Sequence, residues 1–152
     1  MSALRTWSNS EKIGREKGAG DTLITNRNIT ANATVGASTL SASSLVQGII
    51  RRTLSGGALD DTTATGPLIM NALLSNTGNG PSVGESFECT YANATGSIMT
   101  IVGGTGVTVA GTAAVPVAAT VTLHFQCTAV GTNTLANGVY TNVGATFTCT
   151  VF

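Results

Sequence analysis

Residues 119–127 read Ala-Thr-Val-Thr-Leu-His-Phe-Gln-Cys, and the strict alternation of apolar and polar side chains predicts a β-strand with one buried face. The runs 83–91 and 144–152 alternate in the same way, each with a phenylalanine and a cysteine on its apolar face. A strand with one apolar face has to bury that face against another layer. These three runs therefore indicate a mainly β fold with a single layered core.

Shorter runs rich in Thr, Val and Ile extend the same pattern along the chain. We expect strands over 28–35, 48–54, 98–102 and 107–110, with turns at Asn-Ala-Thr-Gly 93–96 and Gly-Gly-Thr-Gly 103–106. Many short strands at this spacing predict an antiparallel β-sandwich, jelly-roll-like in topology. The segment after Val130 carries no motif that assigns it a place in that fold.

Two short helices interrupt the strands. Pro67 opens the stretch 67–74, in which apolar residues recur at helical spacing, so this stretch is expected to be helical. A serine near 41 and apolar residues at helical spacing predict a short helical turn within 40–46. Residues 55–66, rich in Gly, Asp and Thr, are expected to form a loop.

The chain divides into an arm and one domain. Its 152 residues suit a single domain, and we place an extended N-terminal arm at 1–21 and the β-sandwich at 22–152. The arm clusters charges of both signs and lacks helical or strand periodicity. Trp7 is the only tryptophan, and it either fills a pocket on a neighbouring protein or packs back on its own domain. The predicted partner-binding residues of the arm are Arg5, Trp7, Lys12, Arg15 and Lys17.

Charge is scarce and unevenly distributed. Charged residues make up 9% of the chain against about 25% in typical soluble domains, and none follows Glu88. This pattern favours a surface covered by other copies or other proteins, although a neutral Thr/Asn-rich surface that simply stays soluble is the alternative. A net charge of zero gives nucleic-acid binding no electrostatic support. No apolar run reaches the length that spans a membrane, and residues 1–7 lack the apolar core of a signal peptide.

The residues that usually carry catalysis are few and scattered. Cys89, Cys127 and Cys149 each fall on the apolar face of an alternating strand, which is typical of structural core thiols, and a disulfide between two of them stays open. His124, the only histidine, is expected to point away from the core with no acid near it in sequence. We therefore expect no enzymatic activity, no cofactor and no catalytic residues.

Three motifs that suggest ligand sites have simpler interpretations. The glycine-rich 103–106 is followed by a strand rather than the helix a phosphate loop needs, so it is expected to be a turn. Asp60 and Asp61 alone supply too few ligands for Ca²⁺ and are expected to shape a loop. Glu85 and Glu88 face opposite sides of a strand, so they are no glycosidase pair.

The order of segments between 40 and 111 resembles a known class of proteins. Its most specific pieces are Val-Gly-Glu-Ser-Phe-Glu at 83–88 and Gly-Gly-Thr-Gly-Val-Thr-Val at 103–109. This order is similar to β-sandwich structural proteins of virus particles, among them the decoration (cement) proteins of tailed phages and large DNA viruses. The resemblance covers about half of the chain, and both pieces are structural motifs.

The resemblance implies a non-catalytic virion protein, made in the host cytoplasm and placed on the capsid exterior. It implies a homotrimer that contacts the major capsid protein and stabilises the shell by packing. The alternative is a receptor-binding or fibre-tip module of a virus particle. Tyr140 is the one aromatic residue whose predicted loop position favours that alternative.

Overall fold

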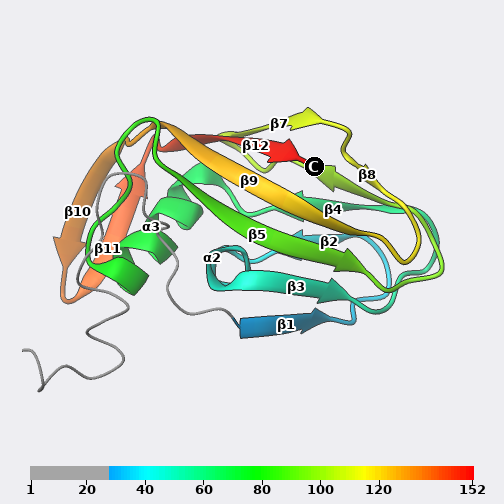
Figure 1. Cartoon of the computed structure of the whole chain (residues 1–152). Helices are drawn as coiled ribbons and strands as arrows, with labels where there is room; N and C mark the ends of the chain where they lie inside the picture. The colour runs from blue at the N-terminus through cyan, green and yellow to red at the C-terminus, as the bar shows by residue number, and fades with distance from the viewer. Residues whose placement is uncertain (1–27) are drawn as a thin grey trace, which may run out of the picture.

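The computed structural model describes residues 28–152, which form a mainly β structure with two helices (Figure 1). Strands account for most of the regular structure and belong to three sheets. The predicted arm at 1–21 and the first six residues of the predicted domain lie outside the described residues. The mainly β prediction is therefore confirmed for the part of the chain from Asn28 onward.

The largest sheet has six strands. Its order is β1 (Asn28–Asn32), β3 (Gly48–Arg52), β5 (Ser86–Asn93), β9 (Thr120–Ala129), β12 (Thr146–Val151) and β7 (Val107–Gly111). The second sheet has four strands in the order β2 (Ser38–Leu40), β4 (Leu59–Thr63), β6 (Met99–Val102) and β8 (Ala114–Val115). A separate hairpin consists of β10 (Thr132–Ala136) and β11 (Val139–Val143).

The first half of the chain alternates between the two larger sheets. β1, β3 and β5 pair in parallel in one sheet, while β2, β4 and β6 pair in parallel in the other. Each strand of one sheet is followed along the chain by a strand of the other, so successive strands of the same sheet run in the same direction. This crossover connection is how parallel strands are joined.

The expectation of a wholly antiparallel, jelly-roll-like sandwich is wrong in this respect. Five of the nine strand pairings are parallel, including β12 with β7. Antiparallel pairing is confined to β5–β9, β9–β12, β6–β8 and the hairpin. Apolar alternation reports which face of a strand is buried and carries no information about the direction of its neighbour, which explains the error.

The two helices are close to their predicted positions. α2 (Ala42–Gln47) begins after Ser41, whose hydroxyl accepts a hydrogen bond from the N–H of Ser44 at 3.2 Å. α3 (Gly66–Thr77) has Pro67 in its first turn and ends at Gly78, whose φ of 74° is the left-handed conformation that favours glycine. Both helices turn their buried residues into the core shared by the sheets.

One apolar core contains side chains from both larger sheets. It draws Phe87, Phe125 and Phe147 from the six-stranded sheet and Leu40, Met99 and Ile101 from the four-stranded sheet. The rings of Phe87 and Phe125 stack with centroids 4.9 Å apart. The apolar faces predicted for 83–91, 119–127 and 144–152 are those that the fold buries, except that Val83 is 63% exposed and Ala119 and Val121 are only half-buried.

Candidate functional site

The predicted partner-binding residues of the arm are Arg5, Trp7, Lys12, Arg15 and Lys17. All five lie outside the described residues, so the arm's role stays a prediction.

The described part of the chain exposes very little charge. Residues 28–152 contain six charged side chains, and two of them, Arg52 and Asp61, are completely buried. The four that remain at the surface are Arg51, Asp60, Glu85 and Glu88. The Glu85 carboxylate accepts a hydrogen bond from the N–H of Ser82 at 2.7 Å, so it also helps to shape its own turn.

Arg52 and Asp61 belong to a buried polar cluster between the sheets. The Nε of Arg52 lies 3.0 Å from Oδ2 of Asp61, and the hydroxyl of Tyr91 donates to the same oxygen at 2.6 Å. The guanidinium also donates to the side chain of Asn32 and to the carbonyls of Thr34 and Gly36. The cluster thus joins β3, β4 and β5 to the loop that leads from β1 to β2.

This cluster changes the interpretation of two sequence features. Residues 55–66 were expected to be a loop, but 59–63 form β4, and Asp60 and Asp61 therefore point to opposite sides of a strand. Burial raises the pKa of Tyr91 above its usual value, and its hydrogen bond to Asp61 adds to the effect. Because Arg52 and Asp61 are both fully buried, neither charged group can contact a substrate, and the cluster is structural. Sequence reasoning missed it because Arg52 and Asp61 meet only through the crossover between the sheets.

The three cysteines are buried, and none of them forms a disulfide. Cys89 lies opposite Leu123 in the sheet, Cys127 opposite Phe147 and Cys149 opposite Phe125, so no two cysteines are direct cross-strand partners. Burial raises the pKa of Cys127 and raises that of Cys149 to about 12. The prediction of structural core thiols is confirmed, and the disulfide left open by the sequence does not form.

His124 points away from the core, as predicted, and is half-buried. Its ring meets that of Phe152 edge-on with centroids 6.3 Å apart. The sheet also places Glu88 directly opposite His124 on the neighbouring strand, which the sequence could not reveal because 36 positions separate them. Two side chains do not make a metal site, and among the described residues no three of His, Cys, Asp or Glu come together in a way that holds an ion.

The glycines of 103–106 form the predicted turn, which joins β6 to β7. A Cβ on Gly103 would collide with the carbonyl of Val107, and one on Gly104 with the carbonyl of Thr63. The N–H of Gly104 donates to the hydroxyl of Thr63 at 2.9 Å. These glycines are needed for close packing of backbone, and one amide that a phosphate would use is already engaged.

The six-stranded sheet presents a broad uncharged surface opposite the core, which we call the outer face. The register aligns its side chains in rows across the strands. The uncharged polar side chains in these rows include Thr90, Thr122, Gln126, Thr148, Thr150 and Thr108. Figure 1 shows β3, β5 and β9 with no helix in front of them, and both described helices pack on the core side. Arg51, Glu88 and His124 are the only ionisable groups on this face of the described strands.

The hairpin offers a second uncharged surface. One of its faces exposes Thr132, Thr134, Ala136, Val139, Thr141 and Val143, and two of these, Val139 and Val143, are among the most exposed apolar residues of the structure. On the other face, β11 packs on α3 with Tyr140 half-buried against the core, whereas Leu135 of β10 is exposed. Asn142 is buried and donates to the carbonyl of Val130 at 2.8 Å, which fixes the hairpin to the body.

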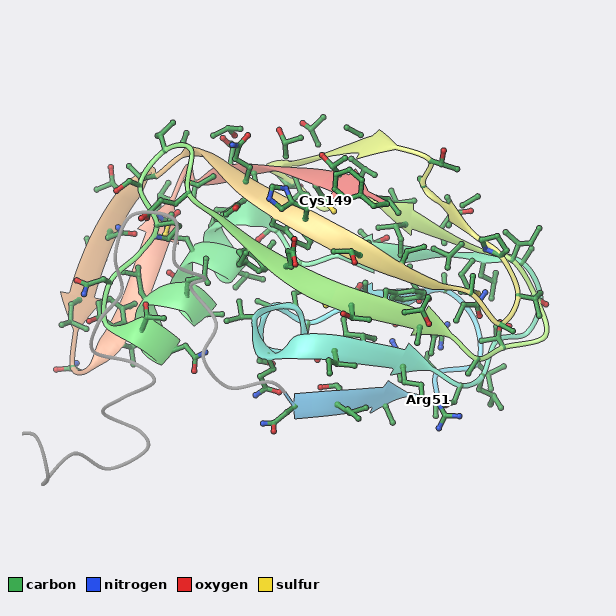
Figure 2. All side chains as sticks on the ribbon, viewed as in Figure 1. Arg51 and Cys149 are labelled. Carbon is green, nitrogen blue, oxygen red and sulfur yellow. The ribbon has the colours of Figure 1, made fainter. Side chains whose placement is uncertain are left out.

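Figure 2 shows how side chains cover the whole described structure. Comparison with known families, curated proteins and solved structures finds no match. No helix among those described is long and apolar enough to cross a membrane. The candidate functional feature is a surface, formed by the outer face and the hairpin, whose described side chains are almost all uncharged.

Proposed function

We propose that this chain is a non-catalytic structural protein of a virus particle, a decoration (cement) protein of the capsid exterior that contacts the major capsid protein. The observation that carries the proposal is the surface: a body of 125 described residues exposes four charged side chains and a wide Thr-rich sheet face. A free monomer normally uses surface charge to stay apart from its neighbours. An uncharged surface of this kind is suited to burial against other proteins.

The architecture supports a scaffold role. We infer that the two larger sheets form a β-sandwich, because one core contains side chains from both sheets, which also meet at Asp61 and Tyr91. Its parallel crossovers set it apart from a jelly roll. The buried charge cluster and the apolar core around it are consistent with a rigid body that presents fixed faces to its partners.

The proposed mechanism is burial of uncharged faces. Threonine and valine side chains on strands are already held by the sheet, so covering them costs little side-chain entropy. Contacts that form only in the assembled shell stabilise the assembled state by mass action. The resemblance implies that the protein binds as a homotrimer, with the arm and Trp7 as the tether to the shell.

The fibre-tip alternative loses its one specific support. Tyr140 was expected in a loop, but it lies on β11, half-buried, with its ring against the core. Its aromatic face is thus not free to hold a glycan. The decoration role is the one that we carry forward.

Charged substitutions on the outer face test the proposal. Thr122→Lys places a cation in the middle of that face, and Thr112→Lys places the same charge in the exposed loop between β7 and β8 as a matched control. We expect Thr122→Lys to reduce the occupancy of the protein on particles at least tenfold, while Thr112→Lys stays at the wild-type level, because an unpaired charge is costly to cover. Equal occupancy of both variants would remove the outer face from the mechanism.

A further inference from the structure

β1 is the edge strand of the six-stranded sheet, and among the described strands it pairs only with β3. Figure 1 shows it along the border of the sheet. Natural sheets protect such edges with charged residues, proline or a bulge. The sequence of β1, Asn-Ile-Thr-Ala-Asn, contains neither a charge nor a proline, and its register with β3 is unbroken. Ile29 on this strand is 70% exposed.

The backbone of β1 offers bonding groups to a further strand. The carbonyl of Asn32 accepts a hydrogen bond from the N–H of Thr53 at 2.9 Å, so this residue turns its backbone groups toward β3. Successive residues of a strand turn these groups to opposite sides. Ile29 and Ala31 therefore direct their N–H and C=O groups to the open edge, and Thr30 directs its own toward β3.

We propose that β1 pairs with β1 of a second copy of this chain, antiparallel about a two-fold axis at Thr30. The strand is close to symmetric about this residue, since asparagine stands at both ends and a small or branched apolar residue on each side. In that arrangement Ile29 lies opposite Ala31 of the second copy. These two residues exchange both hydrogen bonds of a closely spaced antiparallel pair, through backbone groups that no other described strand engages.

The side chains fit the same axis. Thr30 meets Thr30 of the second copy, a favourable cross-strand pair, and each Ile29 packs beside the smaller Ala31. Arg51, labelled in Figure 2, lies beside Ala31 in the sheet. In the proposed dimer, the cross-strand neighbours of Arg51 are Ala31 of the same copy and then Ile29 and Ile49 of the second copy. The two Arg51 side chains are therefore not placed opposite each other. Like charges therefore do not oppose the contact.

This contact does not depend on the virion role. A two-fold contact uses the same patch on both copies, whereas a three-fold ring needs two different patches on each copy. The β1 contact is thus distinct from the contact of the trimer that the resemblance implies, and the two leave different masses in solution.

The first test measures the mass of the full chain by sedimentation equilibrium across a range of concentrations. We expect the wild type to show a two-fold association step that Ala31→Pro and Ile29→Lys abolish. Proline at Ala31 removes an N–H that points to the open edge, so β1 keeps its bonds to β3. Thr112→Lys, in the exposed loop between β7 and β8, is the matched control and should associate as the wild type does. A wild type without the two-fold step, or a two-fold step that survives both β1 variants, would overturn the proposal.

A cross-link provides the second test. In the proposed pair the two Thr30 residues form a non-hydrogen-bonded pair with Cα atoms about 4.5 Å apart, within the range that a disulfide spans. We expect Thr30→Cys to give a covalent dimer with oxidised glutathione, while Ala33→Cys, exposed just beyond β1, and the wild type with its buried thiols do not. Cross-linking of Ala33→Cys that equals that of Thr30→Cys would contradict the two-fold axis.

Discussion

The guanidinium of Arg52 on β3 and the carboxylate of Asp61 on β4 form a fully buried ion pair, with Nε 3.0 Å from Oδ2. The pair joins a strand of the six-stranded sheet to a strand of the four-stranded sheet, and the hydroxyl of Tyr91 donates to the same carboxylate. Arg52 also donates hydrogen bonds to the carbonyls of Thr34 and Gly36. This one side chain therefore links the loop between β1 and β2 to strands β3 and β4. The pair is thus a direct polar contact between the two sheets.

The ion pair gives the first prediction. Asp61→Asn leaves the Arg52 charge buried without its counter-ion, and removing one partner of a buried pair costs about 3–5 kcal/mol. The neighbouring Asp60 is exposed, so Asp60→Asn should change the free energy of unfolding by no more than about 0.5 kcal/mol. Urea unfolding of both variants checks this. If Asp61→Asn and Asp60→Asn lowered the free energy of unfolding by similar amounts, the ion pair would contribute little to stability.

The buried thiols predict a loss of stability at high pH. Burial raises the pKa of Cys149 to about 12, whereas the same thiol in the unfolded chain titrates near about 8.5. The contribution of the Cys149 thiol to the free energy of unfolding is thus fully present below pH ~8.5. It is lost as the pH rises toward about 12, because only the unfolded chain releases the thiol proton between these two pH values. Cys127 and Tyr91 shift in the same direction.

The Cys149→Ala variant isolates the thiol. Its free energy of unfolding should fall less steeply with pH above about 8.5 than that of the wild type, when both are measured by urea unfolding in the same buffers. If the free energy of unfolding fell equally steeply with pH in the two proteins, the raised pKa of Cys149 would be contradicted.

A close backbone approach gives the third prediction. A Cβ on Gly66, at the start of α3, would collide with the carbonyl oxygen of Ala145. Gly96 has open space around the same position and serves as the control. We expect Gly66→Ala to destabilise by about 1–3 kcal/mol through overpacking, and Gly96→Ala to be near neutral in thermal unfolding. A neutral Gly66→Ala would mean that α3 shifts freely against β12.

Much of the core followed from the sequence, and much of the topology did not. Alternation identified the buried faces that carry Phe87, Phe125 and Phe147, because burial of one strand face is a local property. The strands β2, β4 and β8 were missed because each is too short or too polar to alternate visibly. The hairpin was missed for a related reason: all of β10 is exposed, so its sequence lacks an apolar face.

The candidate surface was only partly predictable. The absence of charge after Glu88 is visible in the sequence and indicated an uncharged body. The outer face needs the register, which aligns Thr90 with Thr122 from strands 32 positions apart. The pairing of Glu88 with His124, and of Arg52 with Asp61, likewise depends on crossovers whose lengths differ along the chain.

The arm gives the fourth prediction. Its charged residues and Trp7 are expected to engage the shell, so deletion of residues 1–20 should lower occupancy on particles at least tenfold while the domain still unfolds cooperatively. Trp7→Ala in the full chain tests the anchor separately. Wild-type occupancy of the deletion variant would remove the arm from the mechanism.

The most direct test of the account is the copy number of this chain in purified particles, measured against the main shell protein after a density gradient. A shell role predicts a fixed whole-number ratio to the shell protein, at a level that covers the lattice. A level that fills only special vertices would favour a fibre or vertex module, and the absence of the chain from particles would contradict the virion role altogether.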